Sequence, residues 1–426
     1  MARKGLFAAL EDYDVEDSVV FGDTPYGEDI EQADSEARDE MEEAEKSSEE
    51  IDNILGDADE GIEDTETLQE IGGAIGEAAE TEVGIDEVGI APTIIATEAL
   101  CRNLGMENFK IMPALESFNS TNSRVQATKR ASIAIEGVVS EAIERIKKAL
   151  KLIGEKIMAF IERTVEMYRK QMLAFKTKLS GSIKGMPDGA GEAIASKSLV
   201  RAFGEPSHDI VSVQSAKNVL DSHEEVGKLL SNIANDIGPV CEKIIEAVKD
   251  KSKSLEEISH VAAEEAKKVF EGTLKGKRLV DGMHVEVTAE NGWGRPEFKS
   301  DWTGKEPKEG AKIDAMTKSQ VEAMLKQVDT MMKDAIKEST NVSKAVRAAN
   351  AKLDEVGKVA DVEEDRKRAG ALAISKAVKD FYAVAKEVYN LQNAATKDAL
   401  TYCKESISAA HSKAKGEKKA EGGEGK

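Results

Sequence analysis

Residues 138–160 read VVSEAIERIKKALKLIGEKIMAF, and their apolar side chains recur with the period of an α-helix. The pattern continues to Leu179, so that eleven steps cover 41 residues, about 3.7 residues a step. It predicts one long amphipathic helix over residues 130–181, ending where Gly181 can adopt the left-handed conformation of a helix cap. The positions on its apolar side are Val138, Ala142, Ile146, Ala149, Ile153, Ile157, Phe160, Thr164, Tyr168, Met172, Phe175 and Leu179.

The second face of this predicted helix is rich in basic residues. One interpretation is a solvated face on which charges four residues apart pair with one another. The sharper interpretation is a surface that faces a polyanion. The candidate polyanion-binding residues are Lys147, Lys148, Lys151, Lys156, Arg163, Arg169, Lys170 and Lys178, interrupted by Glu144, Glu155, Glu162 and Glu166.

The charge of the chain changes sign near Glu116. Residues 1–116 hold 34 acidic and 6 basic residues, a net charge of −28, whereas the remainder holds 47 acidic and 53 basic residues, a net charge of +6. The formal charge of −22 is therefore the sum of two unlike segments. We expect residues 1–116 to form an acidic, largely disordered arm, with short helical stretches around 30–55 and 63–80, because apolar residues are sparse there.

An uncharged run, Val88 to Ala96, interrupts the acidic arm. It suggests a short segment that docks on a partner or on the core. Pro92 and the nearby glycines argue against a long helix at this place.

The rest of the chain predicts a mainly α-helical body. Residues 117–275 form a helical region that includes the 130–181 helix, a glycine- and proline-rich break at 182–206, and a helix at 210–248 interrupted at Gly238-Pro239. Residues 306–411 predict a helical hairpin, opened by a capping box of Thr317 and Gln320. Residues 412–426 predict a disordered tail.

Residues 276–305 predict a small β-meander inserted between helices. Asp281-Gly282 and Asn291-Gly292 are turn sequences flanked by strand-forming residues, and the first favours a type I′ turn. Trp293 and Trp302 are expected to form the core of this meander, with base or sugar stacking as the alternative. The predicted fold is thus an elongated bundle of long amphipathic helices with an inserted β-meander and a disordered acidic N-terminal arm.

Signatures of enzyme chemistry are absent from the sequence. The five histidines are scattered, and no HExxH, GxxxxGK[ST] or GxSxG motif occurs. We therefore expect no enzymatic activity, no cofactor, no metal site and no small-molecule substrate. Three distant cysteines argue against a disulfide framework and favour a reducing compartment. Neither a secretory signal nor a stretch of about 18 apolar residues is evident.

The junction between the acidic and basic segments resembles a known family. Ala114-Leu115-Glu116-Ser117-Phe118, then Arg124, Ala127-Thr128 and Ile133–Gly137 opening a basic amphipathic helix, resemble the internal head proteins of large tailed bacteriophages. The resemblance covers roughly residues 110–165 and the acidic-then-basic layout. In that family an acidic propeptide is removed by the prohead protease, which cuts after Glu in small-x-Glu or Leu/Ile-x-Glu sequences.

By this resemblance the cleavage site is Ala114, Leu115, Glu116 and Ser117. Other sequences of the same form occur, Ala96-Thr97-Glu98 among them, but Glu116 lies in a predicted extended linker that a protease can bind. The resemblance implies a structural virion protein processed during capsid maturation, first in the host cytoplasm and then inside the head. Its implied partners are the prohead protease, capsid or other inner-head proteins, and packaged double-stranded DNA bound without sequence specificity.

Two other kinds of protein fit the same pattern. In one, the 138–179 helix lies in the interface of a membrane. In the other, the chain is a cytosolic helical-bundle adaptor whose acidic arm serves only as a solubilising tail.

Overall fold

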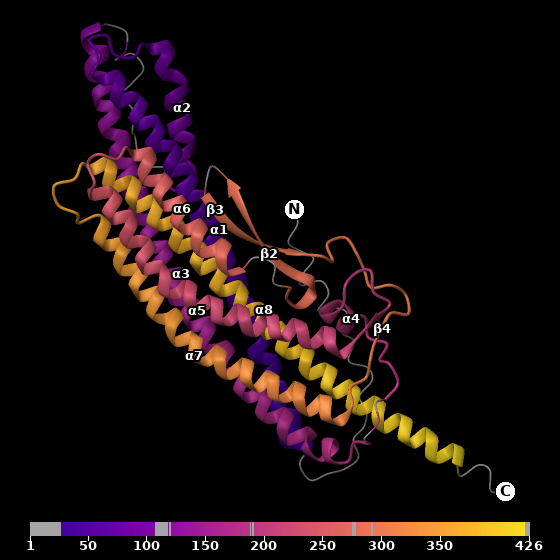
Figure 1. Ribbon diagram of the computed structural model, residues 1–426. Coiled ribbons are helices and arrows are strands. Elements are labelled where there is room, and N and C mark those ends of the chain that lie inside the picture. The colour runs from indigo at the N-terminus through magenta and orange to yellow at the C-terminus, as the bar shows by residue number, and fades with distance from the viewer. Residues whose placement is uncertain are drawn as a thin grey trace.

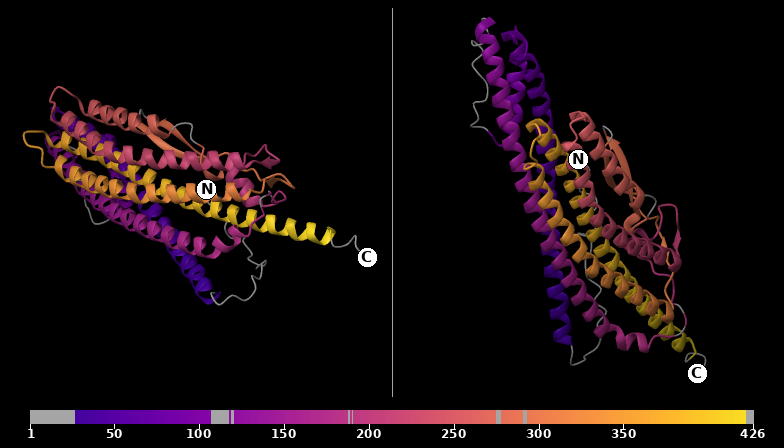
Figure 2. Two further views of the ribbon diagram at one scale, coloured as in Figure 1. Left: turned by 60° about the horizontal axis from the view of Figure 1, so that its bottom comes forward. Right: turned by 60° about the vertical axis from the view of Figure 1, so that its left-hand side comes forward.

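The computed structural model is an elongated bundle of long helices (Figure 1). It describes residues 27–106, 118, 121–187, 189, 191–274, 278–290 and 293–421. The main helices are α1 (Gly27–Ala79), α2 (Glu87–Asn103), α3 (Thr121–Lys184), α4 (Lys197–Phe203), α5 (Val213–Lys249), α6 (Leu255–Leu274), α7 (Lys318–Val356) and α8 (Glu364–Glu421). In Figure 1 and in the right-hand view of Figure 2, α1, α2 and α3 project beyond the other helices at one end, and Figure 1 shows the C-terminal part of α8 projecting at the other.

The long amphipathic helix predicted around residues 130–181 is confirmed and is longer than expected. It runs over 64 residues, from Thr121 to Lys184. Its predicted apolar side faces the protein interior, because Val138, Ile146, Ile153 and Ile157 are buried. That side is therefore covered by protein and does not face a membrane in this arrangement.

Helix α1 is the main departure from the sequence prediction. Residues 27–79, expected to be largely disordered, form one helix of 53 residues. The physical reason is a mostly apolar stripe, with members three, four or seven residues apart, which packs along α3. The buried members of this stripe are Ile51, Leu55, Ala58, Ile62, Thr65, Leu68, Ile75 and Ala79.

Helix α1 runs antiparallel to α3. Glu50 of α1 pairs with Lys156, whereas Gly72 lies against Ile135, so the residue number falls along α3 as it rises along α1. Helix α1 also contacts α8, and it therefore lies on both helices at once.

Two prolines are accommodated inside helices. Pro92 lies within α2, and Pro239 lies within α5, which continues without the expected interruption. Each proline removes one backbone donor from its helix. Helix α2 is stabilised at its start by a cap, in which the Asp86 side chain accepts a hydrogen bond from the Gly89 N–H.

Helix α8 is also longer than expected. It continues to Glu421, past residue 411 where the helix was expected to end.

The predicted capping box and β-turn are confirmed, whereas the helix cap predicted at Gly181 is wrong, because α3 continues through that residue to Lys184. Thr317 and Gln320 form the predicted capping box at the start of α7. In the turn, Asp281 and Gly282 both have positive φ, 56° and 61°, as a type I′ turn requires.

The inserted sheet has two strands among the described residues, where three were expected. Strands β2 (Met283–Glu290) and β3 (Trp293–Ser300) pair antiparallel, and Arg278 adds a single bridge to His284. A second, parallel pair joins β1 (Ile210–Val211) to β4 (Lys312–Ile313). The β2–β3 hairpin packs on α6 at the outside of the bundle.

Candidate polyanion-binding surface

The predicted cleavage site lies outside the described residues. Ala114, Leu115, Glu116 and Ser117 fall between α2, which ends at Asn103, and α3, which begins at Thr121. The structure therefore fixes which helices flank the site and leaves the site itself a prediction.

The eight basic residues predicted on α3 have different surroundings. Lys148 and Arg163 are exposed and form no ion pair with the part of the chain that the structure describes. Lys170 is also exposed and has an interaction partner. The side chains of Arg169 and Lys178 lie outside the described residues.

Three of the eight are paired with carboxylates, and two of these pairs link α3 to other helices. Lys147 is buried and pairs with Glu144 at 2.9 Å within α3. Lys151 reaches Asp354 of α7 at 2.7 Å, and Lys156 reaches Glu50 of α1 at 2.7 Å. These lysines are engaged by carboxylates in the folded chain and do not form one free cationic row with Lys148 and Arg163.

A second set of lysines, on α8, also faces α1. Lys376 pairs with Glu66 at 2.6 Å, Lys379 pairs with Asp59, and Lys386 pairs with Asp52. Lys379 and Lys386 are nearly enclosed, with 8 % and 4 % of their side-chain surface exposed. Their carboxylate partners are more exposed, so the larger cost arises when a carboxylate is removed and an enclosed lysine is left without its partner.

These ion pairs form an antiparallel ladder between α1 and α8. Neutral contacts extend it at both ends: Asn390 donates to the Ser48 hydroxyl at 3.0 Å, and the Gln69 amide donates to the Asp365 carbonyl at 3.5 Å. Sequence reasoning missed the ladder because the acidic run of α1 was interpreted as self-repelling. The signal that reveals it is the spacing of Asp52, Asp59 and Glu66, seven residues apart beside the apolar stripe.

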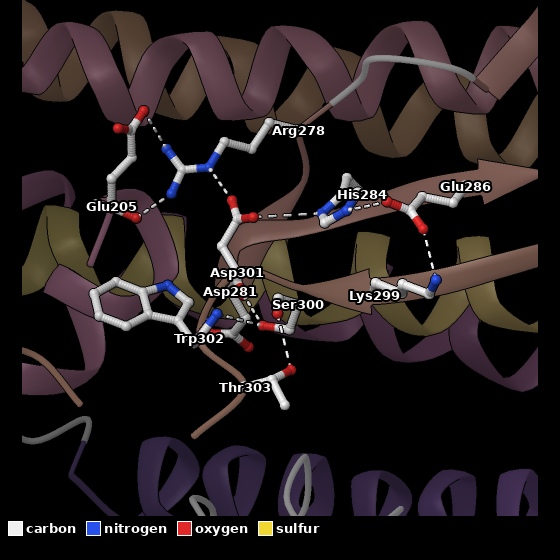
Figure 3. Close-up of polar contacts among 11 residues, drawn as sticks. Glu205, Arg278, Asp281, His284, Glu286, Lys299, Ser300, Asp301, Trp302 and Thr303 are labelled. Carbon is white, nitrogen blue, oxygen red and sulfur yellow. Dashed lines mark hydrogen bonds and ion pairs between the residues drawn. The ribbon is translucent and has the colours of Figure 1, made fainter. Parts of the chain in front are cut away.

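A separate polar network surrounds the β2–β3 hairpin (Figure 3). Arg278 pairs with Glu205 at 3.1 Å and with Asp301 at 3.6 Å, and His284 approaches the second oxygen of Asp301 at 3.6 Å. Lys299 donates to Glu286 at 2.6 Å and thereby lowers the pKa of that carboxyl. The network ties the hairpin to the segment after α4, and its mixed charges offer no cationic face to a polyanion.

Trp302 lies beneath this network and is 2 % exposed. Its indole packs against the positive-φ position of Gly282, where an added Cβ would lie 3.1 Å from the ring. A side chain so enclosed fills the small core and cannot stack on a base or sugar. The Trp293 side chain lies outside the described residues.

Chemistry-bearing side chains are not assembled into a reactive site in the described part of the chain. No three His, Cys, Asp or Glu residues there are placed to hold a metal ion. Cys101, Cys241 and Cys403 are free and buried, so burial raises their thiol pKa values. Among the described helices, none combines the length and apolar character needed to cross a membrane.

The chain was compared with curated proteins, solved structures and family models. No curated protein and no solved structure matches the chain significantly. The family model of the phiKZ-like phage internal head proteins matches residues 27–411, which is most of the chain and begins where α1 begins. This is a family of structural proteins of the phage head and not a family of enzymes. Because this match covers nearly the full length, the chain belongs to the phiKZ-like phage internal head proteins.

Proposed function

We propose that this internal head protein is cut after Glu116 during capsid maturation and then associates with packaged double-stranded DNA or with the inner capsid surface. The observation that carries the proposal is the pairing of an acidic helix with lysines of the body: Glu50, Asp52, Asp59 and Glu66 of α1 each engage a lysine of α3 or α8. All four carboxylates lie on the N-terminal side of Glu116, and all four lysines lie on its C-terminal side.

The proposed mechanism is electrostatic. Before cleavage, the segment of charge −28 neutralises cations of the body and limits premature binding to nucleic acid. Once the cut segment has been displaced, the body of charge +6 can contact DNA phosphates without reading the base sequence. Such binding releases condensed counterions and therefore weakens steeply as salt is added.

The partners follow from this sequence of events. The prohead protease acts on the linker between α2 and α3, and capsid or other inner-head proteins surround the product. The protein is made in the host cytoplasm and ends in the head interior. Lys148, Arg163 and Lys170 on α3 are the exposed candidates for the first contacts with DNA.

The proposal is tested by determining the N-terminus of the protein recovered from mature phage heads. We expect N-terminal sequencing and intact mass to give a chain beginning at Ser117, and Glu116→Gln to leave the chain uncut. Glu98→Gln is the matched control, because Ala96-Thr97-Glu98 has the same small-x-Glu form but lies within α2, where a protease would first have to unfold the helix. A mature protein that begins at Met1, or one that is still cut in Glu116→Gln, would contradict the proposal.

A further inference from the structure

Four lysines face α1 and are named the lysine row. Lys376, Lys379 and Lys386 lie on α8, and Lys156 lies on the neighbouring helix α3; all four direct their ammonium groups at α1. Because α1 runs antiparallel to both helices, one acidic helix occupies the whole row. The carboxylate of Asp380 also lies 3.3 Å from Lys379, and the neutral pair of Asn390 and Ser48 continues the contact between α1 and α8.

The spacing of the charges suits a linear polyanion. Asp52 and Asp59 are seven residues apart, and so are Lys379 and Lys386, which corresponds to about 10.5 Å along each helix. Asp52, Asp59 and Glu66 therefore place three negative charges along one side of α1, at intervals of about 10.5 Å, which is a wider spacing than that of phosphates but equally linear. The lysines that face α1 already provide cationic contacts for such a line in the folded chain.

Helix α1 is weak as a helix on its own. It contains five glycines between residues 56 and 76, and a glycine inside a helix costs about 1 kcal/mol relative to alanine. Packing does not require all of them, because an added Cβ at Gly56 or Gly73 would meet nothing within 4 Å. The helical form of α1 thus depends on its docking, and a competitor that takes the lysines also removes part of what keeps α1 folded.

We propose that Lys156, Lys376, Lys379 and Lys386 are a polyanion-binding site that α1 occupies in the free protein, with Glu50, Asp52, Asp59 and Glu66 standing where phosphate groups bind. The inference rests on the proposed function only for the identity of the polyanion, which is double-stranded DNA. It adds a second cationic surface to the one predicted on α3 and makes α1 its intramolecular competitor.

The site has a defined salt dependence. Four lysine–phosphate contacts on duplex DNA give a slope of about −3.6 in a plot of log affinity against log salt concentration. The contribution of this row to the affinity should therefore fall about 150-fold between 50 and 200 mM salt.

The experiment compares full-length variants binding a labelled DNA duplex at 50 mM salt, followed by fluorescence anisotropy. Asp52→Asn, Asp59→Asn and Glu66→Gln together remove the carboxylates that cover the α8 lysines. Asp57→Asn, Glu63→Gln and Glu70→Gln together remove three exposed carboxylates of the same helix that do not face those lysines, so the net charge of the two triple variants is equal. We expect the first variant to bind DNA about 10-fold more tightly than the second.

Two further variants show that the lysines and the docking of α1 are responsible. Adding Lys376→Gln, Lys379→Gln and Lys386→Gln to the first variant should abolish its gain. Gly56→Ala with Gly73→Ala strengthens α1 without changing any charge and should weaken DNA binding relative to the wild type. Circular dichroism spectra that match the wild type would confirm that each variant is folded.

Equal gains in the two charge-matched variants, or a gain that survives the lysine substitutions, would overturn the inference. The assay uses the uncut chain and does not depend on the prohead protease. Failure to find a mature N-terminus at Ser117 would therefore leave this result standing, and failure of this assay would leave cleavage after Glu116 untouched.

Discussion

Glu338 of α7 is a buried acid with an unusual titration. It is 6 % exposed, and it lies with the Gln392 amide around Gly227 of α5, where an added Cβ would be 2.6 Å from each of the two side chains. Burial, reinforced by the charge of Asp334, raises its pKa from 4.5 to about 7, and Lys228 only partly opposes this shift. The neutral form of Glu338 is therefore the one that the fold accommodates.

This raised pKa predicts a pH-dependent stability. The contribution of neutral Glu338 is complete below about pH 4.5 and is lost as the pH rises through about 7. Glu338→Gln cannot ionise, so we expect the variant to be more stable than the wild type at pH 8, by on the order of 3 kcal/mol, and to show no such difference near pH 4.5. Denaturant unfolding at a series of pH values measures this, and equal pH profiles for the two proteins would contradict it.

At the scale of the helices, close crossings depend on particular glycines. Gly370 lies where α8 meets α5, and an added Cβ there would come within 2.4 Å of a Val248 methyl group and 3.1 Å of a Val356 methyl group. We expect Gly370→Ala to destabilise the bundle by about 1–3 kcal/mol through overpacking. Gly73→Ala in α1 is the matched control, since its Cβ meets open space and should stabilise the protein by up to about 1 kcal/mol. Thermal unfolding measures the change in stability of each variant, which should have opposite signs. A Gly370→Ala variant more stable than the wild type would contradict a close helix crossing at Gly370.

The helices that the sequence predicted well are those whose apolar pattern is not masked by charge. The stripe of α3 and the capping box of Thr317 and Gln320 are local signals, and both were recovered. Helix α1 carries a comparable stripe, but its glycines and acidic runs favoured disorder when the segment was considered alone. Its helical state is a tertiary effect, because α3 covers its apolar side and lysines of α8 neutralise its acids.

Tertiary contacts also explain why the sequence did not predict the prolines inside helices or the ion-pair partners of the basic residues on α3. Pro92 and Pro239 were interpreted as helix breaks, yet each lies in a helix that other contacts support. On α3 the sequence identified the basic residues but not their partners, since Asp354 and Glu50 lie on distant segments. The α8 lysines that pair with α1 are more than 300 positions away from those acids along the chain, so no local pattern connects them.

At the scale of the whole molecule, the packing of α1 limits the structural effect of cleavage after Glu116. A cut after Glu116 would sever the chain but leave the apolar stripe of α1 on α3. Each fully buried Ile or Leu of that stripe contributes about 1.5–3 kcal/mol, so the cut alone does not detach the helix. The family match begins at residue 27, which places α1 within the shared architecture. A competitor for the lysines is then what moves α1 away from α8.

The most direct measurement is hydrogen–deuterium exchange of the full-length protein with and without saturating duplex DNA at low salt. The amides of residues 48–79 should exchange faster when DNA is bound, because α1 loses its ion pairs and depends on docking to stay helical, whereas α5 and α7 should be unchanged. If DNA binds and α1 keeps the protection it has in the free protein, α1 does not compete with DNA for the lysine row, and the account is contradicted.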